Sequence, residues 1–373
     1  MNQVLVNLIA GSSLLSSVMI FLNPNKYNIA GNRWLGLFVF CVFLLNIDEC
    51  LYFNNIYCEH IKFYAFSLYC IVPVFYFTII YFIKPDKKWK PLYYLHFIFG
   101  LLFVILEQNS TQIVQGNMVI NTTVSSGFLI YFNQFLMYIV LPLQLIVYLS
   151  QCFIEITKHN QNIKKFSSNT NEISLKWLKD ILYIIISFSF FYFIYIFTQS
   201  AVMINLSLFI ALFFISYNSI RQKEIFPYSD NSKKEIRAII FAERNQKSKK
   251  KMESSPEDSQ KFENLLRVMQ TEKLFLNTNL SLFSLANRLA VSAHNLSFII
   301  NEFSGENFNQ FINRYRVEEA QKMIINSKNN HLSILGIGYE VGFNSKSAFN
   351  TTFKKVTNQT PNEFKKANFS QEN

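Results

Sequence analysis

Long apolar stretches fill the first 220 residues of the chain, whereas charged and apolar residues alternate in the remaining part. A helix of roughly 20 apolar residues crosses the ~30 Å hydrocarbon core of a bilayer, because it satisfies its backbone hydrogen bonds internally. Seven stretches fit this requirement and lack the polar face that a soluble helix repeats about every 3.6 residues. We predict spans at residues 3–22, 34–53, 63–83, 91–106, 126–151, 177–198 and 201–217. The fourth is short and the last two almost touch, so six or eight spans are open alternatives.

Short amphipathic helices replace the apolar stretches after residue 259. Leucine and alanine residues three or four positions apart predict a supporting helix over residues 282–289. Ser292 follows after a short turn and is suited to cap a second helix, 292–303, by accepting its free backbone N–H groups. This pair of helices has the layout of a helix-turn-helix.

A second pair of helices repeats the same layout at residues 334–341 and 345–355. Gly342 lies in its turn, where glycine adopts a positive φ at little cost. A longer helix, 307–327, joins the two pairs. Each pair exposes one short polar helix, as an element that enters the DNA major groove requires.

A lysine-rich and then acidic segment, residues 221–258, separates the two parts and is interpreted as a linker. Within it, Ile236, Ile239 and Ile240 recur at helical spacing among basic residues. Three interpretations of this pattern stay open: a solvated helical stub, a helix on the inner leaflet of the membrane, and a dimerising segment. The predicted organisation is a membrane domain at 1–220, the linker at 221–258, a helical domain at 259–367 and a tail at 368–373.

The distribution of charge predicts which side of the membrane each part occupies. The first 220 residues hold 12 Lys or Arg and 8 Asp or Glu, and the remaining residues hold 23 and 16. Basic residues concentrate after the first, third and fifth spans, and short cytoplasmic loops carry such an excess. They are Lys26, Arg33, Lys84, Lys87, Lys88, Lys90, Lys158, Lys164, Lys165 and Lys176. We expect the amino terminus outside, no cleavable signal peptide, and a cytoplasmic helical domain.

Several residues of the helical domain recur in the order and spacing of a known family. They are Leu285-Ala286, Val291-Ser292, Leu296-Ser297, Gly305, Phe308, Ile312, Arg316, Ala320, Ile337, Gly342-Phe343, Ser347, Phe349, Phe353-Lys354-Lys355, Thr360-Pro361 and Phe364. On these residues the domain resembles the DNA-binding domain of the AraC/XylS family. The resemblance implies an all-α domain of seven helices with two reading helices about 34 Å apart, which reach adjacent segments of the major groove. The whole layout also resembles membrane-embedded members of that family.

Carried onto this chain, the resemblance places DNA-contacting residues in both helix pairs. They are Ser292, Ala293, His294, Asn295 and Ser297 in the first pair, and Asn344, Ser345, Lys346, Ser347, Asn350, Lys354 and Lys355 in the second. Asparagine bonds adenine bidentately, and lysine reaches guanine or phosphate. Arg314 and Lys322 are further phosphate candidates, whereas Arg316 is expected to tie the joining helix to the domain core. The 13 basic and 8 acidic residues of the domain agree with a nucleic-acid partner.

The chain departs from the family pattern at four positions. Phe298 and Thr351 stand where family members commonly carry arginine, which implies weaker nonspecific binding to DNA. Gly338 replaces a common alanine. Asn358 replaces the usual glycine, and asparagine tolerates the left-handed conformation.

The predicted membrane domain contains few ionisable or reactive side chains. Asp48 and Glu49 lie near the outer end of the second span, and ionisable groups in a span are candidates for sensing a signal, although both also fit the membrane interface. Cys50 and Cys58 are candidates for a disulfide in an oxidising compartment. Histidine and cysteine show no metal-site spacing, and no glycine-rich phosphate loop occurs. We expect no metal, no cofactor and no enzymatic activity.

The sequence therefore favours an all-α chain that combines about seven transmembrane helices with a seven-helix DNA-binding domain. Its expected role is a one-component transcription regulator in the inner membrane of a bacterial cell, coupling a membrane or extracellular signal to promoter binding. Expected partners are double-stranded promoter DNA, the lipid bilayer, an unknown signal ligand, a second copy of the chain, and RNA polymerase if the protein is an activator. Two alternatives stay open: a transporter or receptor whose tail tethers DNA, and a regulator released by cleavage of the linker.

Overall fold

The computed structural model describes residues 2–23, 27–54, 63–108, 131–132, 134–170, 173–198, 201–223, 225, 255–326, 328 and 331–369. Every regular element within these ranges is a helix, which confirms the predicted all-α fold class. The chain divides into two compact units. The first comprises Met1–Lys158 and Leu175–Ile225, and the second comprises His159–Ser174 and Phe226–Asn373.

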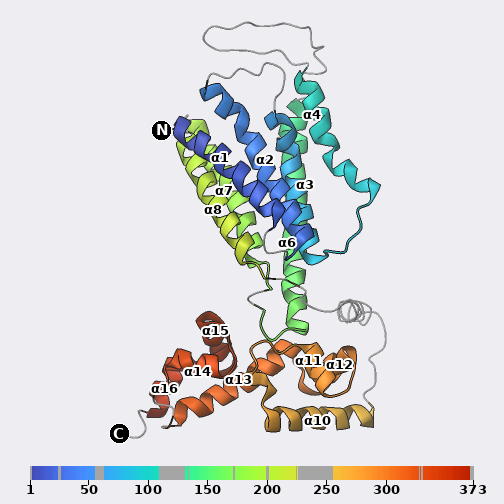
Figure 1. Ribbon diagram of the computed structural model, residues 1–373, viewed down its shortest axis with the longest axis vertical. Helices are drawn as coiled ribbons and strands as arrows, with labels where there is room; N and C mark the ends of the chain where they lie inside the picture. Colours follow the sequence, from blue (N-terminus) through green and yellow to red (C-terminus); the bar gives the residue numbers. More distant parts are fainter. Residues whose placement is uncertain are drawn as a thin grey trace. The chain divides into compact units, whose positions relative to one another are not determined.

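Each predicted span has a helical counterpart in the first unit, shown in blue to yellow-green in Figure 1. The elements are α1 (Asn2–Leu22), α2 (Ile29–Phe53), α3 (Phe63–Ile83), the 3-10 helix η1 (Pro91–Phe97) with α4 (Ile98–Gln108), the π-helical turn η2 (Leu136–Val140) with α6 (Leu141–Asn162), α7 (Lys176–Thr198) and α8 (Val202–Arg221). Among the described residues, five helices are long and apolar enough to cross a membrane. These are the helices at Asn2–Leu22, Ile29–Phe53, Phe66–Ile83, Leu136–Lys165 and Val202–Arg221.

Helices that follow one another along the chain pack together in the first unit, α1 against α2, α2 against α3, and α3 against α4, and α1 also packs against α8. Between α1 and α2, Ser17 Oγ donates a 2.8 Å hydrogen bond to the carbonyl oxygen of Gly36. Apolar side chains also face outward, as for Val4 (61% exposed) and Leu15 (63%). Exposing such apolar side chains to water is unfavourable. A surface of this kind is therefore better suited to contact with hydrocarbon.

Among the described residues, two span boundaries differ from the predictions by five residues or more. Helix α2 begins at Ile29 rather than at residue 34, directly after Asn28 in a left-handed conformation. Helix α6 continues to Asn162, so Lys158 is helical rather than part of a loop. Polar residues become frequent after position 151 and end the apolar stretch. The segment 152–162 nevertheless contains no glycine or proline that would end a helix. The predicted start of this span, 126–130, lies outside the described residues.

The second unit contains α10 (Pro256–Glu272), the 3-10 helix η4 (Leu274–Leu276), α11 (Leu282–Arg288), α12 (Ala293–Ser304), α13 (Phe308–Ile325), α14 (Ile334–Glu340), α15 (Lys346–Thr357) and α16 (Pro361–Phe369). The five helices that we predicted here begin and end within two residues of these bounds. Figure 1 shows α13 lying between the pair α11–α12 and the pair α14–α15. One apolar core lies on the α11–α12 side, around Leu285, Leu296 and Phe311, and another on the α14–α15 side, around Ile337 and Phe353.

Helix α10 begins inside the segment that we assigned to the linker. Ser255 caps it, with its side chain accepting from the backbone N–H of Asp258, while the Asp258 carboxylate accepts from the backbone N–H of Ser255. Proline in the first turn and two acidic residues complete a strong helix start. The composition that suggested a linker is therefore also a capping signal. The rest of the predicted linker, including Ile236, Ile239 and Ile240, lies outside the described residues.

The segment between α6 and α7 belongs to the second unit, although we assigned it to the membrane domain. It contains the 3-10 helix η3 (Ile163–Lys165). Ile163 and Phe166 are 1% exposed and join the same apolar core as α11, α12 and the start of α13. The sequence did not indicate this division, because the contacts join residues more than a hundred positions apart.

Candidate nucleic-acid interface

Arg316 on α13 anchors the scaffold that carries both helix pairs. Its guanidinium is buried, and Nε and Nη2 donate hydrogen bonds of 2.7 and 2.8 Å to the carbonyl oxygens of Phe275 and Asn277. The same group lies 5.7 Å from the ring centroid of Phe343. Burial lowers the pKa of Arg316 to about 10, which leaves it charged at neutral pH. The expected role of Arg316 as a tie between the joining helix and the core is confirmed.

The first helix pair is fixed by local hydrogen bonds at its turn. Ser292 Oγ accepts from the backbone N–H of Asn295 at 3.1 Å, which confirms Ser292 as the cap of α12. In the preceding turn Ala290 adopts a φ of 54°, an uncommon conformation for a residue with a Cβ atom. No feature of the sequence signalled this conformation. The positive φ of Ala290 allows the chain to turn from α11 into α12, although no glycine lies in this turn.

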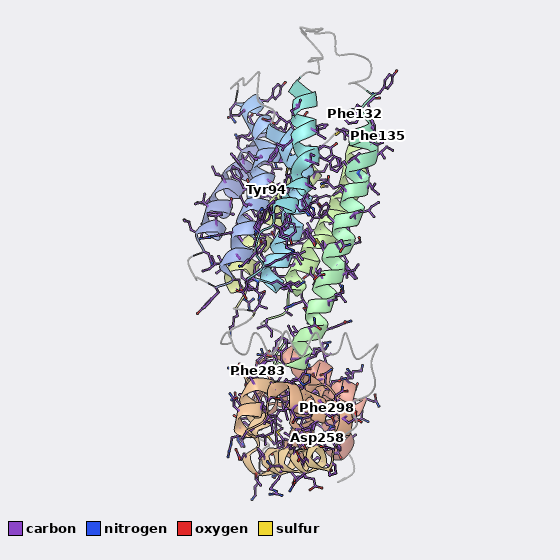
Figure 2. All side chains as sticks on the ribbon, turned by 90° about the vertical axis from the view of Figure 1, so that its right-hand side faces the viewer. Tyr94, Phe132, Phe135, Asp258, Phe283 and Phe298 are labelled. Carbon is purple, nitrogen blue, oxygen red and sulfur yellow. The ribbon has the colours of Figure 1, made fainter. Side chains whose placement is uncertain are left out.

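The predicted DNA-contacting residues of α12 are not equally accessible. His294 and Ser297 are partly exposed, whereas Ala293 is 2% exposed and belongs to the core, so its side chain is not accessible and its contact with DNA stays a prediction. Position 293 follows the cap directly, and its short side chain belongs to the core cluster that also contains Leu285 and Ala286. Asn295 is partly buried, and its side-chain amide donates a 3.4 Å hydrogen bond to Asp258 of α10. Phe298, labelled in Figure 2, is partly exposed on the same helix.

Gly342 forms the turn of the second helix pair, as predicted. Its φ is 96°, and a Cβ atom there would lie 2.7 and 2.8 Å from the backbone oxygens of Leu276 and Phe275. A side chain is therefore excluded both by conformation and by the chain that Arg316 holds in place. Gly338, one turn earlier, is equally crowded, since a Cβ atom would lie 2.7 Å from the ring of Phe349. This packing accounts for the departure from alanine at position 338.

Helix α15 presents the predicted contacts of the second pair at its amino-terminal end. Ser345 caps the helix by accepting from the backbone N–H of Ala348 at 3.2 Å. Lys346 and Ser347 are exposed, and Asn350 is partly exposed one turn later. Lys354 and Lys355 lie in the last turn, where cations stabilise the helix dipole. Asn344 donates a 2.8 Å hydrogen bond to the side chain of Asn169 in the segment between α6 and α7.

Arg314 is paired within the domain, so the expectation that it contacts phosphate is not supported by its environment. Its guanidinium donates hydrogen bonds to Glu306 at 3.0 Å and to Glu318 at 3.1 Å. Burial lowers its pKa, but the two carboxylates outweigh that effect and the pKa is raised. Lys322 is mostly exposed, with its ammonium 4.0 Å from Glu319. Asn358 has a φ of 61°, as expected for a residue that replaces glycine.

The two acids of the first unit take part in contacts between helices. Asp48 Oδ2 accepts a 2.9 Å hydrogen bond from the backbone N–H of Tyr64 in the first turn of α3. Glu49 Oε1 accepts a 3.3 Å hydrogen bond from Asn2 of α1. These are structural contacts, and the sensing role stays a prediction. Cys58, the second half of the candidate disulfide, lies outside the described residues.

A pocket of about 330 Å³ in the first unit was not anticipated. It is lined by Leu92, Leu95, His96, Phe99, Gln144 and Tyr148. The presence of histidine and glutamine within apolar stretches is the sequence signal that could have indicated it. Among the described residues, no group of three His, Cys, Asp or Glu side chains could hold a metal ion.

Comparison with known proteins places the helix pairs in a family. A family model described as a helix-turn-helix domain matches residues 285–367. An uncharacterised HTH-type transcriptional regulator in the cgkA 5′ region of Pseudoalteromonas carrageenovora is 31% identical over 106 residues, which cover 26% of this chain and 59% of that protein. The probable transcription factor PqrA of Proteus vulgaris is 30% identical over 101 residues, which cover 27% of this chain and 80% of that protein.

A solved structure of a protein of unknown function from Listeria innocua is 28% identical, over 28% of this chain and 95% of that one, with a TM-score of 0.25. The matches with both regulators cover only about a quarter of this chain, and the matched part spans less than two thirds of the first regulator. Residues 285–367 contain both helix pairs and the scaffold helix α13 between them. The chain therefore belongs to the helix-turn-helix transcription regulators of the AraC type.

Proposed function

We propose that this protein is a sequence-specific transcription regulator held in a bacterial inner membrane, with its first unit in the bilayer and its second unit in the cytoplasm. The observation that carries the proposal is the presence on one chain of two capped reading helices and of several helices with outward apolar side chains. A signal received by the membrane helices would change promoter binding by the second unit. Promoter DNA is therefore the partner of α12 and α15.

Chemistry at the two reading helices supports contact with bases and phosphates. Each helix begins at a serine cap, so its first-turn side chains lie next to the positive end of the helix dipole. Lys346 is exposed at the amino-terminal end of α15, and His294 is partly exposed at that of α12. Amide, hydroxyl and ammonium groups in such a position match the acceptors and donors of the major groove.

The test is chromatin immunoprecipitation of the full-length protein beside a variant with Asn295, Lys346 and Asn350 changed to alanine. A matched variant with Asn264→Ala and Gln270→Ala, both exposed on α10, controls for surface changes outside the reading helices. We expect discrete promoter peaks with the wild type and the control, and their loss in the reading-helix variant. Uniform or absent enrichment with the wild type would contradict sequence-specific binding.

Membrane attachment is tested on the same cells by separating membranes from the soluble fraction. The proposal requires the full-length chain in the membrane fraction while the promoters are occupied. A shorter soluble fragment at the promoters would favour release by cleavage of the linker. DNA in membrane fractions without promoter peaks would favour a transporter or receptor that only tethers DNA.

A further inference from the structure

The segment between α6 and α7 completes the core of the second unit. Phe166 is 1% exposed, Ile163 is 1% exposed and Ile173 is 8% exposed, all within the core that α11, α12 and α13 form. Burial of apolar side chains of this size removes them from water and stabilises the contact. The side chains of the segment are therefore part of the core of the second unit.

Backbone pairing adds to this attachment. Ser167 and Ser281 form an antiparallel β-bridge just before α11. The carbonyl oxygen of Phe166 accepts from the N–H of Leu282 at 3.0 Å, and the N–H of Ser168 donates to the carbonyl oxygen of Leu280 at 3.3 Å. These bonds join the segment to the first helix pair.

Side chains of the scaffold helix α13 close over the same segment. Asn309 donates to the carbonyl oxygens of Ser167 and Ser168 at 3.1 and 2.8 Å. Arg316 donates from Nη2 to Ser168 Oγ at 3.2 Å. The residue that orders the domain core thus also binds the segment, so docking of the segment and the order of the core are coupled.

One contact reaches the predicted DNA-contacting residues. Asn344 Nδ2 donates to Asn169 Oδ1 at 2.8 Å, from the position that precedes the cap of α15. An amide that holds Asn169 is not available in the same geometry to a base edge or a phosphate. The segment thus contacts the first helix pair through its backbone and the second pair through Asn169.

We propose that residues 163–170, together with Ile173, form a docking segment that lowers the affinity of the second unit for DNA, and through which the membrane helices control that unit. This inference rests on the proposed function. Both ends of the segment continue into helices that we predict to span the membrane, since α6 precedes it and α7 follows it. A signal that changes the separation or rotation of α6 and α7 pulls the segment from its site and frees Asn344.

A reversible crosslink between positions 167 and 281 tests the proposal on the full-length protein in lipid nanodiscs. The flanking hydrogen bonds make these positions a non-hydrogen-bonded antiparallel pair, whose Cα atoms lie about 4.5 Å apart, within the range for a disulfide. The variant carries Ser167→Cys and Ser281→Cys. The two single-cysteine variants, treated with the same oxidant, control for the native cysteines and for loss of the Ser281 cap of α11.

The disulfide must form in the embedded protein, and the oxidised form must bind the promoter fragment recovered by immunoprecipitation about tenfold more weakly than the reduced form, or about 1.4 kcal/mol. Failure of the crosslink to form overturns docking. Equal or tighter binding by the oxidised form overturns the inhibitory role. Crosslink formation is measured without DNA, so it tests docking independently of DNA binding. If neither form binds DNA, the proposed function and the inhibition are both refuted, whatever the crosslink shows.

A second variant, Asn169→Ala, removes the acceptor of Asn344 without changing the buried residues of the segment. We expect it to bind the promoter fragment several-fold more tightly than the wild type, because Asn344 no longer has to be released. Asn344→Ala serves as the comparison, since it removes the same hydrogen bond together with the DNA contact and is expected to bind more weakly. Weaker binding by Asn169→Ala would contradict the proposal.

Discussion

The Nε atom of Arg316 on α13 donates a 2.7 Å hydrogen bond to the carbonyl oxygen of Phe275, in the 3-10 helix that precedes the first helix pair. This bond joins the middle of the scaffold helix to the 3-10 helix whose carbonyl oxygens also crowd Gly342 in the turn of the second pair. One buried cation therefore orders both helix pairs. Its loss should be felt throughout the domain rather than at one surface.

Replacing Arg316 by methionine keeps much of the side-chain volume but leaves buried carbonyl groups without a donor. An unsatisfied buried polar group costs about 1–3 kcal/mol, so we expect the opening free energy of α13 and of the chain around Phe275 to fall by about 3 kcal/mol. Hydrogen exchange of the full-length protein measures this change. The exposed Arg267→Met on α10 is the control and should leave the exchange rates of α13 unchanged. Equal protection in both variants would refute the anchoring role.

Gly342 and Gly305 both have positive φ, at 96° and 69°, but they differ in their surroundings. A Cβ atom at Gly305 meets nothing within 4 Å, whereas at Gly342 it meets two backbone oxygens. We expect Gly305→Ala to cost about 1–2 kcal/mol from conformation alone. Gly342→Ala should cost clearly more, because backbone atoms cannot move aside. Hydrogen exchange of α13 to α15 compares them, and similar losses would contradict the crowding at Gly342.

Ser345 combines a capping role with a predicted contact to DNA, and two substitutions separate these roles. Ser345→Ala removes the cap of α15 and should destabilise that helix by about 1 kcal/mol. Ser345→Asp keeps a capping oxygen but places a negative charge where phosphate is expected. We therefore expect normal protection of α15 but much weaker DNA binding for the aspartate variant, measured by hydrogen exchange and fluorescence anisotropy. Undiminished DNA binding by Ser345→Asp would place Ser345 away from the DNA.

The amino terminus of α10 should lose stability in acid. Hydrogen bonds from the backbone N–H and the hydroxyl of Ser255, with smaller contributions from Asn295 and Lys261, lower the pKa of Asp258 below its ordinary value of 3.8. A lowered folded pKa means that this stabilisation is present above pH 3.8 and is lost as the pH falls through the folded pKa. Hydrogen exchange of α10 as a function of pH checks this.

Asp258→Asn should remove that acid-dependent loss while keeping an oxygen at the cap. Glu363, whose pKa is lowered by hydrogen bonds from Thr360 at the start of α16, serves as the matched site. Glu363→Gln should change the acid response of α16 and leave that of α10 as in the wild type. A pH response of α10 that survives Asp258→Asn would assign it to another group.

Local features of the sequence determined most of the element boundaries. Ser292 and Ser345 cap the reading helices where their spacing predicted, and Gly342 forms the turn, because caps and turns depend on residues within four positions of one another. The apolar stretches likewise predicted the helices of the first unit, since length and composition alone decide whether a helix suits a bilayer. The family motif identified the reading helices for the same reason, namely that its residues recur at fixed local spacing.

Only the tertiary structure decided which of the predicted residues face outward and which are already paired. Ala293 is buried, Arg314 is held by two carboxylates, and Asn344 binds Asn169, a residue 175 positions away in the chain. The docking of residues 163–170 and Ile173 depends on the same kind of long-range contact. Hydropathy and spacing describe neighbours along the chain, whereas these partners are brought together by packing around α13 and Arg316.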